Sequence, residues 1–141
     1  MLTEDMKEEK MRAEIFEDVN EKSLKVVTNR TNIRFVMPDD EVPTSAEIFE
    51  FSRKEFDRFK GYLETEAKRI WKNLNPRVAD SFESDYDEYY DREHDNEGSL
   101  KFLDREGSTI QLSLWAPYGS TNRLYQFNKR RMESFLFDLN Y

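Results

Sequence analysis

The stretch SAEIFEFSRKEFDRFKGYLETEAKRIWKNL, residues 45–74, is the part of the chain that decides the expected fold. Apolar side chains recur in it at steps of three and four residues, the spacing of one face of an α-helix. They are Phe49, Phe56, Phe59, Leu63, Ala67, Ile70 and Leu74. Thr44 and Glu47 have the spacing of a capping box, and Asn75-Pro76 is a typical helix stop. The sequence therefore predicts one long amphipathic helix over residues 45–74.

Two elements are expected before this helix. Residues 23–37 hold two β-prone runs separated by Asn29-Arg30-Thr31-Asn32, which is typical of a hairpin. Residues 3–19 predict a charged helix with a thin apolar stripe. Because few apolar residues anchor that stripe, the alternative for this region is a mobile arm.

More elements are expected after the long helix. Val78, Phe82, Tyr86, Tyr89 and Tyr90 keep helical spacing after Pro76, so residues 76–91 predict a second amphipathic helix. Residues 92–99 are typical of a polar loop, and residues 100–103 and 110–115 of another hairpin. A short strand over residues 124–127 and a final helix capped by Asn128 complete the chain.

Composition favours one small folded domain over residues 1–141, with residues 1–20 as a helical arm. Charged residues make up 37%, but 11 Phe, 7 Tyr and 2 Trp are enough aromatic side chains for a modest core. The order of the elements favours an α+β fold over a parallel sheet. We expect an antiparallel sheet of two hairpins packed with a long central helix, an acidic helix and a C-terminal helix.

The absence of cysteine excludes disulfides and thiolate metal sites. The first ten residues, MLTEDMKEEK, are charged where a signal peptide would be apolar. No apolar run approaches the ~20 residues that a membrane span needs. We therefore expect a cytoplasmic protein without a membrane partner.

The negative charge of the chain is concentrated in one stretch. The formal net charge is -8, and residues 80–97 alone contain nine carboxylates and one arginine. The remaining residues therefore balance to zero. Because clustered like charges repel one another, such a stretch reduces stability unless it is solvated or bound to a partner. Aromatic residues alternate with these acids, which suits either packing on the core or contact with a partner.

This pattern predicts an acidic interaction protein that inhibits a partner by binding its basic or nucleic-acid-binding surface. A fixed row of carboxylates resembles the phosphate backbone of DNA, so a nuclease is a typical target. DNA-mimic inhibitors made by phages or plasmids against restriction or CRISPR nucleases belong to this functional class. The candidate partner-binding residues are Glu83, Asp85, Tyr86, Asp87, Glu88, Tyr89, Tyr90, Asp91, Glu93 and Asp95. Direct nucleic-acid binding is not expected, since Lys129-Arg130-Arg131 is interpreted as a solvated face.

Catalytic and metal-binding patterns are weak. His94 is the single histidine, and no catalytic motif is recognisable, so we expect neither an enzyme nor a cofactor. Glu93, Asp95 and Glu97 match the first ligand positions of an EF-hand loop, but Asp104 is too short for its last position. They are weak candidates for a metal site. Two alternatives remain open: a carboxylate-based metal-binding domain or small enzyme, and a structural subunit with a merely solvated acidic face.

Overall fold

The computed structural model describes residues 12–36, 47–78, 88–91, 96–105, 109–115 and 125–140. Its elements are β1 (Arg12–Glu17), β2 (Ser23–Thr28), β3 (Ile33–Val36), β4 (Glu47–Ser52), α2 (Arg53–Ile70), β5 (Glu88–Asp91), β6 (Asn96–Arg105), β7 (Thr109–Trp115), β8 (Gln126–Phe127) and α3 (Lys129–Leu139). The expected α+β class, with antiparallel strands, a long central helix and a C-terminal helix, is confirmed.

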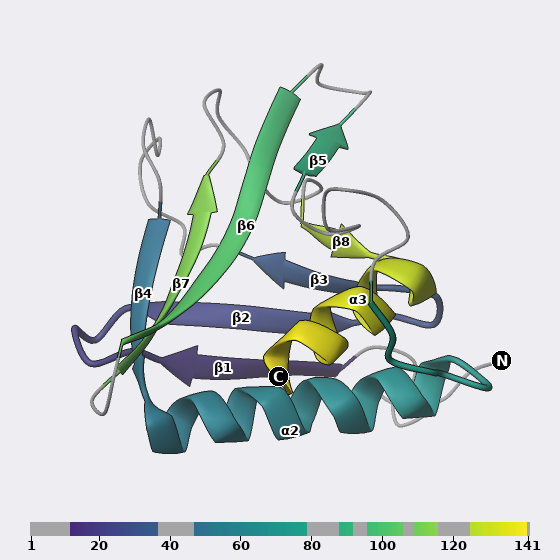
Figure 1. Ribbon diagram of the computed structural model, residues 1–141, viewed down its shortest axis with the longest axis horizontal. Helices are drawn as coiled ribbons and strands as arrows, with labels where there is room; N and C mark the ends of the chain where they lie inside the picture. Colours follow the sequence, from purple (N-terminus) through teal and green to yellow (C-terminus); the bar gives the residue numbers. More distant parts are fainter. Residues whose placement is uncertain are drawn as a thin grey trace, which may run out of the picture.

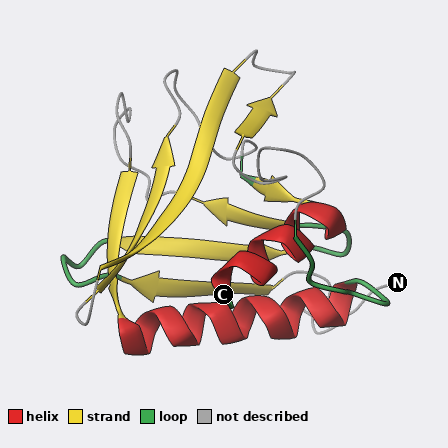
Figure 2. Ribbon diagram, viewed as in Figure 1, coloured by secondary structure: helices red, strands yellow, loops and turns green. Residues whose placement is uncertain are grey.

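The strands form two four-stranded sheets. Sheet A has the order β1-β2-β3-β8, sheet B has the order β4-β7-β6-β5, and every pairing is antiparallel. The two expected hairpins therefore lie in different sheets instead of one. Figure 1 shows the strands of sheet B crossing those of sheet A steeply, with α2 alongside β1. Figure 2 shows the two helices against these crossed sheets.

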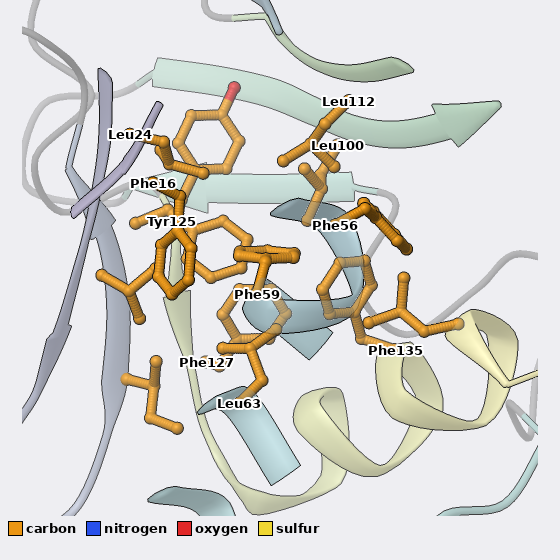
Figure 3. Close-up of a cluster of buried hydrophobic side chains, with 14 of the residues drawn as sticks. Phe16, Leu24, Phe56, Phe59, Leu63, Leu100, Leu112, Tyr125, Phe127 and Phe135 are labelled. Atoms are coloured by element: carbon orange, nitrogen blue, oxygen red, sulfur yellow. The ribbon is translucent and has the colours of Figure 1, made fainter. Parts of the chain in front are cut away.

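The core is built from the inward faces of both sheets and from both helices. In sheet A, Phe16 lies opposite Leu24, and in sheet B, Phe49 lies opposite Leu112. All four are fully buried, as alternate residues of a strand with one covered face should be. Phe59 of α2 lies at the centre of the cluster (Figure 3), with its ring centroid 5.3 Å from that of Phe16.

Phe59 also links the two sheets directly. Its ring centroid lies 5.6 Å from that of Phe35 in sheet A and 5.9 Å from that of Phe51 in sheet B. Aromatic pairs at these separations add to the hydrophobic gain from burying their surface. One helix residue therefore holds both sheets to α2.

The helix expected over residues 3–19 is wrong in its described part, because residues 12–17 form β1. Residues 3–11 lie outside the described ranges. In this strand Arg12 pairs in register with the buried Thr28, and Phe16 pairs with the buried Leu24. Arg12 and Glu14, which share the face of Phe16 in this strand, are both charged, so the alternation typical of a strand is hidden in the sequence.

The long helix begins eight residues later than expected. Residues 47–52 form β4, in which Phe49 and Phe51 are buried, and α2 begins at Arg53. The cap is Ser52, whose Oγ accepts a hydrogen bond of 3.1 Å from the Glu55 backbone N–H. The capping box assigned to Thr44 and Glu47 is wrong, since Glu47 belongs to a strand. Ser52 and Glu55 have the same spacing, but the Glu55 carboxylate binds the Glu17 N–H and Arg58, so Ser52 caps the helix with its hydroxyl alone.

The acidic helix expected over residues 76–91 is wrong at both ends. Residues 75–78 have no regular structure, and residues 88–91 form β5. Residues 79–87 lie outside the described ranges. Part of the expected loop 92–99 is also strand, because β6 begins at Asn96. Tyrosine favours strands by its intrinsic propensity, so Tyr89 and Tyr90 indicated a strand. The helical spacing of the same residues had indicated a helix instead.

The two expected hairpins and the final helix are confirmed, and the strand expected over residues 124–127 is confirmed at residues 126–127. Residues 23–28 and 33–36 form the first hairpin, in which the Asn29 N–H donates to the Asn32 carbonyl at 2.8 Å. The hairpin of β6 and β7 contains the second pair of predicted strands. Residues 126–127 form β8, and Asn128 caps α3 by accepting a hydrogen bond of 2.8 Å from the Arg131 N–H.

Candidate functional site

The described part of the acidic stretch lies at one edge of sheet B. Of the ten candidate partner-binding residues, four are described, and they make up β5: Glu88, Tyr89, Tyr90 and Asp91. Among the described residues this strand pairs with β6 alone. Tyr90 lies opposite Glu97 and Asp91 opposite Asn96. The other six, Glu83, Asp85, Tyr86, Asp87, Glu93 and Asp95, lie outside the described ranges.

An edge strand presents charge differently from a helix. On a helix, residues three and four positions apart share a face, whereas in a strand every second residue does. The single-sided row of carboxylates that the helix would have provided is therefore not available from β5. The acidic stretch, residues 80–97, instead contributes a short strand, β5, at the edge of sheet B.

The chain enters the acidic stretch along α3. The backbone N–H of Asn75 donates to the Glu133 carboxylate at 2.8 Å, and Arg77 Nε lies 3.8 Å from the same group. Arg130 Nη2 donates to the Val78 carbonyl at 2.7 Å. Residues 75–78 are therefore held against the first two turns of α3. The basic cluster at residues 129–131, interpreted as a solvated face, contributes at least one side chain to this attachment.

A second charged cluster surrounds Glu66, which is only 2% exposed. Arg69 Nε and Nη2 each donate to this carboxylate at 3.1 Å, and Arg12 Nη1 lies 4.0 Å away. Burial alone would raise the pKa of Glu66. The hydrogen bonds and charge of Arg69, with the charge of Arg12, outweigh burial, and the net effect lowers the pKa. Glu66 is therefore held ionised.

Two buried hydroxyls lie beside this carboxylate. Thr28 Oγ1 and Tyr62 Oη have no hydrogen-bond partner of ordinary geometry within the described chain. Burial, together with the nearby negative charge of Glu66, raises the pKa of the Tyr62 hydroxyl. Arg69 binds both oxygens of Glu66, and the lowered pKa makes the carboxylate a weak base. We therefore interpret this cluster as an ion pair that stabilises the fold.

The outer edge of β1, on the side away from β2, is covered by side chains of α2. Glu55 accepts a hydrogen bond of 3.1 Å from the Glu17 N–H, and Arg58 donates one of 2.7 Å to the Ile15 carbonyl. Arg58 also donates to Glu55 at 2.7 Å, which lowers the pKa of Glu55. Its guanidinium carbon lies 4.3 Å from the Phe16 ring centroid, in a cation–π contact. An edge covered in this way is poorly available to a further strand.

The edge of β4 is covered by the turn between β1 and β2. The Asp18 carboxylate, 5% exposed, accepts backbone hydrogen bonds from Asn20 and Lys22 within the turn, and from Glu50 in β4. The Val19 N–H donates to the Glu50 carbonyl at 2.8 Å. Asp18 therefore joins an end of sheet A to an edge of sheet B.

The EF-hand pattern starting at Glu93 is not compatible with the fold. Residues 96–105 form one continuous strand, so they cannot wrap around an ion as the loop pattern requires. Asp104, the last residue of that pattern, forms an ion pair with Arg53. Across the described ranges, no three His, Asp or Glu side chains lie close enough together to hold a metal ion. Neither α2 nor α3 is long and apolar enough to cross a bilayer.

Three buried acids were missed by sequence reasoning: Asp18, Glu66 and Glu133. Glu66 had a signal, because it falls within the apolar stripe of α2 with Arg69 three residues later. Asp18 accepts two local hydrogen bonds, from Asn20 and Lys22, but its bond from Glu50 and the partners of Glu133 come from distant parts of the sequence. Comparison of the chain with protein-family models, with curated proteins and with solved structures finds no match.

Proposed function

We propose that this protein is an acidic interaction protein that binds the basic, nucleic-acid-binding surface of a partner such as a nuclease, and inhibits it. The observation that carries the proposal is the concentration of the whole net charge of -8 in residues 80–97. Part of this stretch lies in β5 and the start of β6, at an edge of sheet B.

Electrostatics support this proposal. Duplex DNA carries about one negative charge per 1.7 Å of its axis, so proteins that bind it present matching positive surfaces. A dense acidic stretch attracts such a surface and accelerates the encounter by steering. The residues outside 80–97 have a net charge of zero, so they add no net positive charge that would repel a basic partner surface.

The experiment is an affinity capture from the native cell lysate with matched charge variants. The test variant carries Asp87→Lys, Glu88→Lys and Asp91→Lys. The control carries Glu17→Lys, Glu21→Lys and Asp57→Lys, which change the net charge equally at exposed positions outside the acidic stretch. Circular dichroism establishes that both variants are folded before capture.

We expect the wild type and the control to retain a nucleic-acid-binding protein that the test variant does not retain. Duplex DNA should displace that protein, because both compete for one surface. Raising the salt from roughly 50 to 200 mM should release it, as for contacts that replace counterions. Retention of the same proteins by the test variant, or retention insensitive to DNA, would contradict the proposal.

A further inference from the structure

Sheet B has an outer face, on the side away from the core, that is open to solvent. Figure 1 shows β4, β7 and β6 side by side, and their inward residues, such as Phe49 opposite Leu112, belong to the core. Because side chains alternate along a strand, the residues between these point outward. Six outward residues lie in register across the three strands and define the outer patch: Ile48, Ser113 and Lys101 in one row, and Glu50, Gln111 and Leu103 in the next. All six are exposed or half-buried.

Two corners of the outer patch are apolar although they face water. Ile48 is 39% exposed and Leu103 is 54% exposed. Val19, 52% exposed, borders the patch, because its N–H donates to the Glu50 carbonyl in β4. Three of the five large apolar side chains that are exposed in the described chain therefore gather at this face. Apolar residues that cluster at the surface, instead of being scattered singly, are typical of an interaction surface.

The other two corners carry opposite charges. Glu50 in β4 and Lys101 in β6 are separated by the width of β7 and by one step of two residues along the strands, so their Cα atoms lie about 12 Å apart. Within the described chain neither side chain forms an ion pair. Ser113 and Gln111, between them on β7, are uncharged. The outer patch therefore has two unpaired opposite charges on one diagonal and two apolar side chains on the other.

This arrangement is complementary to itself. The four corners form a rectangle about 10 Å across the strands and about 7 Å along them. Two sheets that pack face to face with their strands at about 90° adopt one of the two common packing geometries. With a two-fold axis along the diagonal from Ile48 to Leu103, each apolar corner then meets its own copy, and Glu50 meets Lys101 of the second copy at two symmetric places. The corners superpose to within about 2 Å, a distance that the long lysine side chain spans.

We propose that the outer patch binds a second copy of this chain, in a dimer with the two B sheets packed face to face. In such an isologous contact one surface patch is buried against itself, so the patch has to be self-complementary. The contact is smaller than a standard interface of about 20–30 residues a side, so the dimer is weak, with a Kd on the order of 0.1 mM. The inference is independent of the proposed function, because none of these residues lies in residues 80–97.

Sedimentation velocity from about 10 µM to about 1 mM protein measures this association on both sides of the expected Kd. Salt at about 0.15 M screens the net charge of -8 on each copy. Two single variants, Glu50→Lys and Lys101→Glu, place like charges opposite each other at both symmetric contacts. The control is Lys25→Glu, at an exposed position of β2, which changes the net charge as Lys101→Glu does. Circular dichroism establishes that every variant is folded.

We expect the wild type and Lys25→Glu to dimerise, and each of the two patch variants alone to associate at least about tenfold more weakly, because like charges opposite each other are costly. An equimolar mixture of Glu50→Lys and Lys101→Glu should recover the wild-type affinity, since both contacts of the mixed dimer again join opposite charges. An effect of net charge alone would instead move the two variants in opposite directions, because one reduces the negative charge of the chain and the other increases it.

Three results would each overturn the inference. The first is a wild type that stays monomeric at the highest concentration. The second is a patch variant that associates as strongly as the wild type, which would assign the contact to another surface. The third is a mixture of the two variants that associates no better than either variant alone.

Discussion

At the level of single residues, Glu66 shows how the fold accommodates a buried charge. Replacing it by Glu66→Gln keeps the shape of the side chain but removes the ion pairs with Arg69 and Arg12. We expect the free energy of unfolding at neutral pH to fall by about 1–3 kcal/mol, the range for hydrogen bonds to charged groups. Urea denaturation measures this directly.

The pH dependence of the same variant gives a second readout. The pKa of Glu66 is lowered from its ordinary value of 4.5 in the folded state, so the unfolded chain binds its proton more readily. The stabilisation by Glu66 is therefore fully present above 4.5 and lost as the pH falls through the folded-state pKa. The wild type and Glu66→Gln should converge in stability toward acid pH. A difference that stays constant from about pH 7 to about pH 3 would contradict this.

At the level of elements, α2 contains a glycine, a residue of low helix propensity, in its interior. Gly61 is exposed in the middle of the helix, and a Cβ added there would meet no atom within 4 Å. Because alanine removes backbone entropy from the unfolded chain, Gly61→Ala should raise the free energy of unfolding by about 0.5–1 kcal/mol. Thermal unfolding tests this, and a loss of stability would mean that a segment of the chain approaches Gly61.

The elements predicted correctly from sequence are those determined by local signals. The β2–β3 hairpin follows from its turn residues, and α3 follows from its Asn128 cap. Strand β4 was missed because Phe49 lies seven residues before Phe56, the spacing of two helical turns, so it also continued the helical stripe. Strand β1 was missed because Arg12 and Glu14, on the same face as the buried Phe16, are charged, and Arg12 pairs with Glu66 far along the sequence.

The candidate site was predictable in composition but not in form. The charge of residues 80–97 is visible in the sequence alone. Its placement at a sheet edge depends on the pairing of β5 with β6, and those residues also fit a helical spacing. Non-local pairing of this kind leaves little trace in a periodic pattern, because strand propensity depends on neighbours.

At the level of the whole molecule, Asp18 helps to join the turn after β1 in sheet A to strand β4 in sheet B. Asp18→Ala would leave the backbone N–H groups of Asn20, Lys22 and Glu50 without their acceptor. We expect a loss of about 2–4 kcal/mol in the free energy of unfolding, because water can reach only some of these groups. Asn20→Ala is the control, since it keeps the backbone donor, and it should change the stability little. Comparable losses in both variants by urea denaturation would show that the joint does not depend on the carboxylate.

The strand orders of the two sheets also have a consequence for synthesis of the protein. Strand β4 is complete at residue 52 but pairs with β7, which begins at residue 109, and β3 pairs with β8 at residues 126–127. During synthesis, β3 and β4 therefore leave the ribosome long before β8 and β7, the strands with which they pair. A nascent chain released before residue 109 leaves both strands without them, so premature termination would yield fragments prone to aggregation or proteolysis.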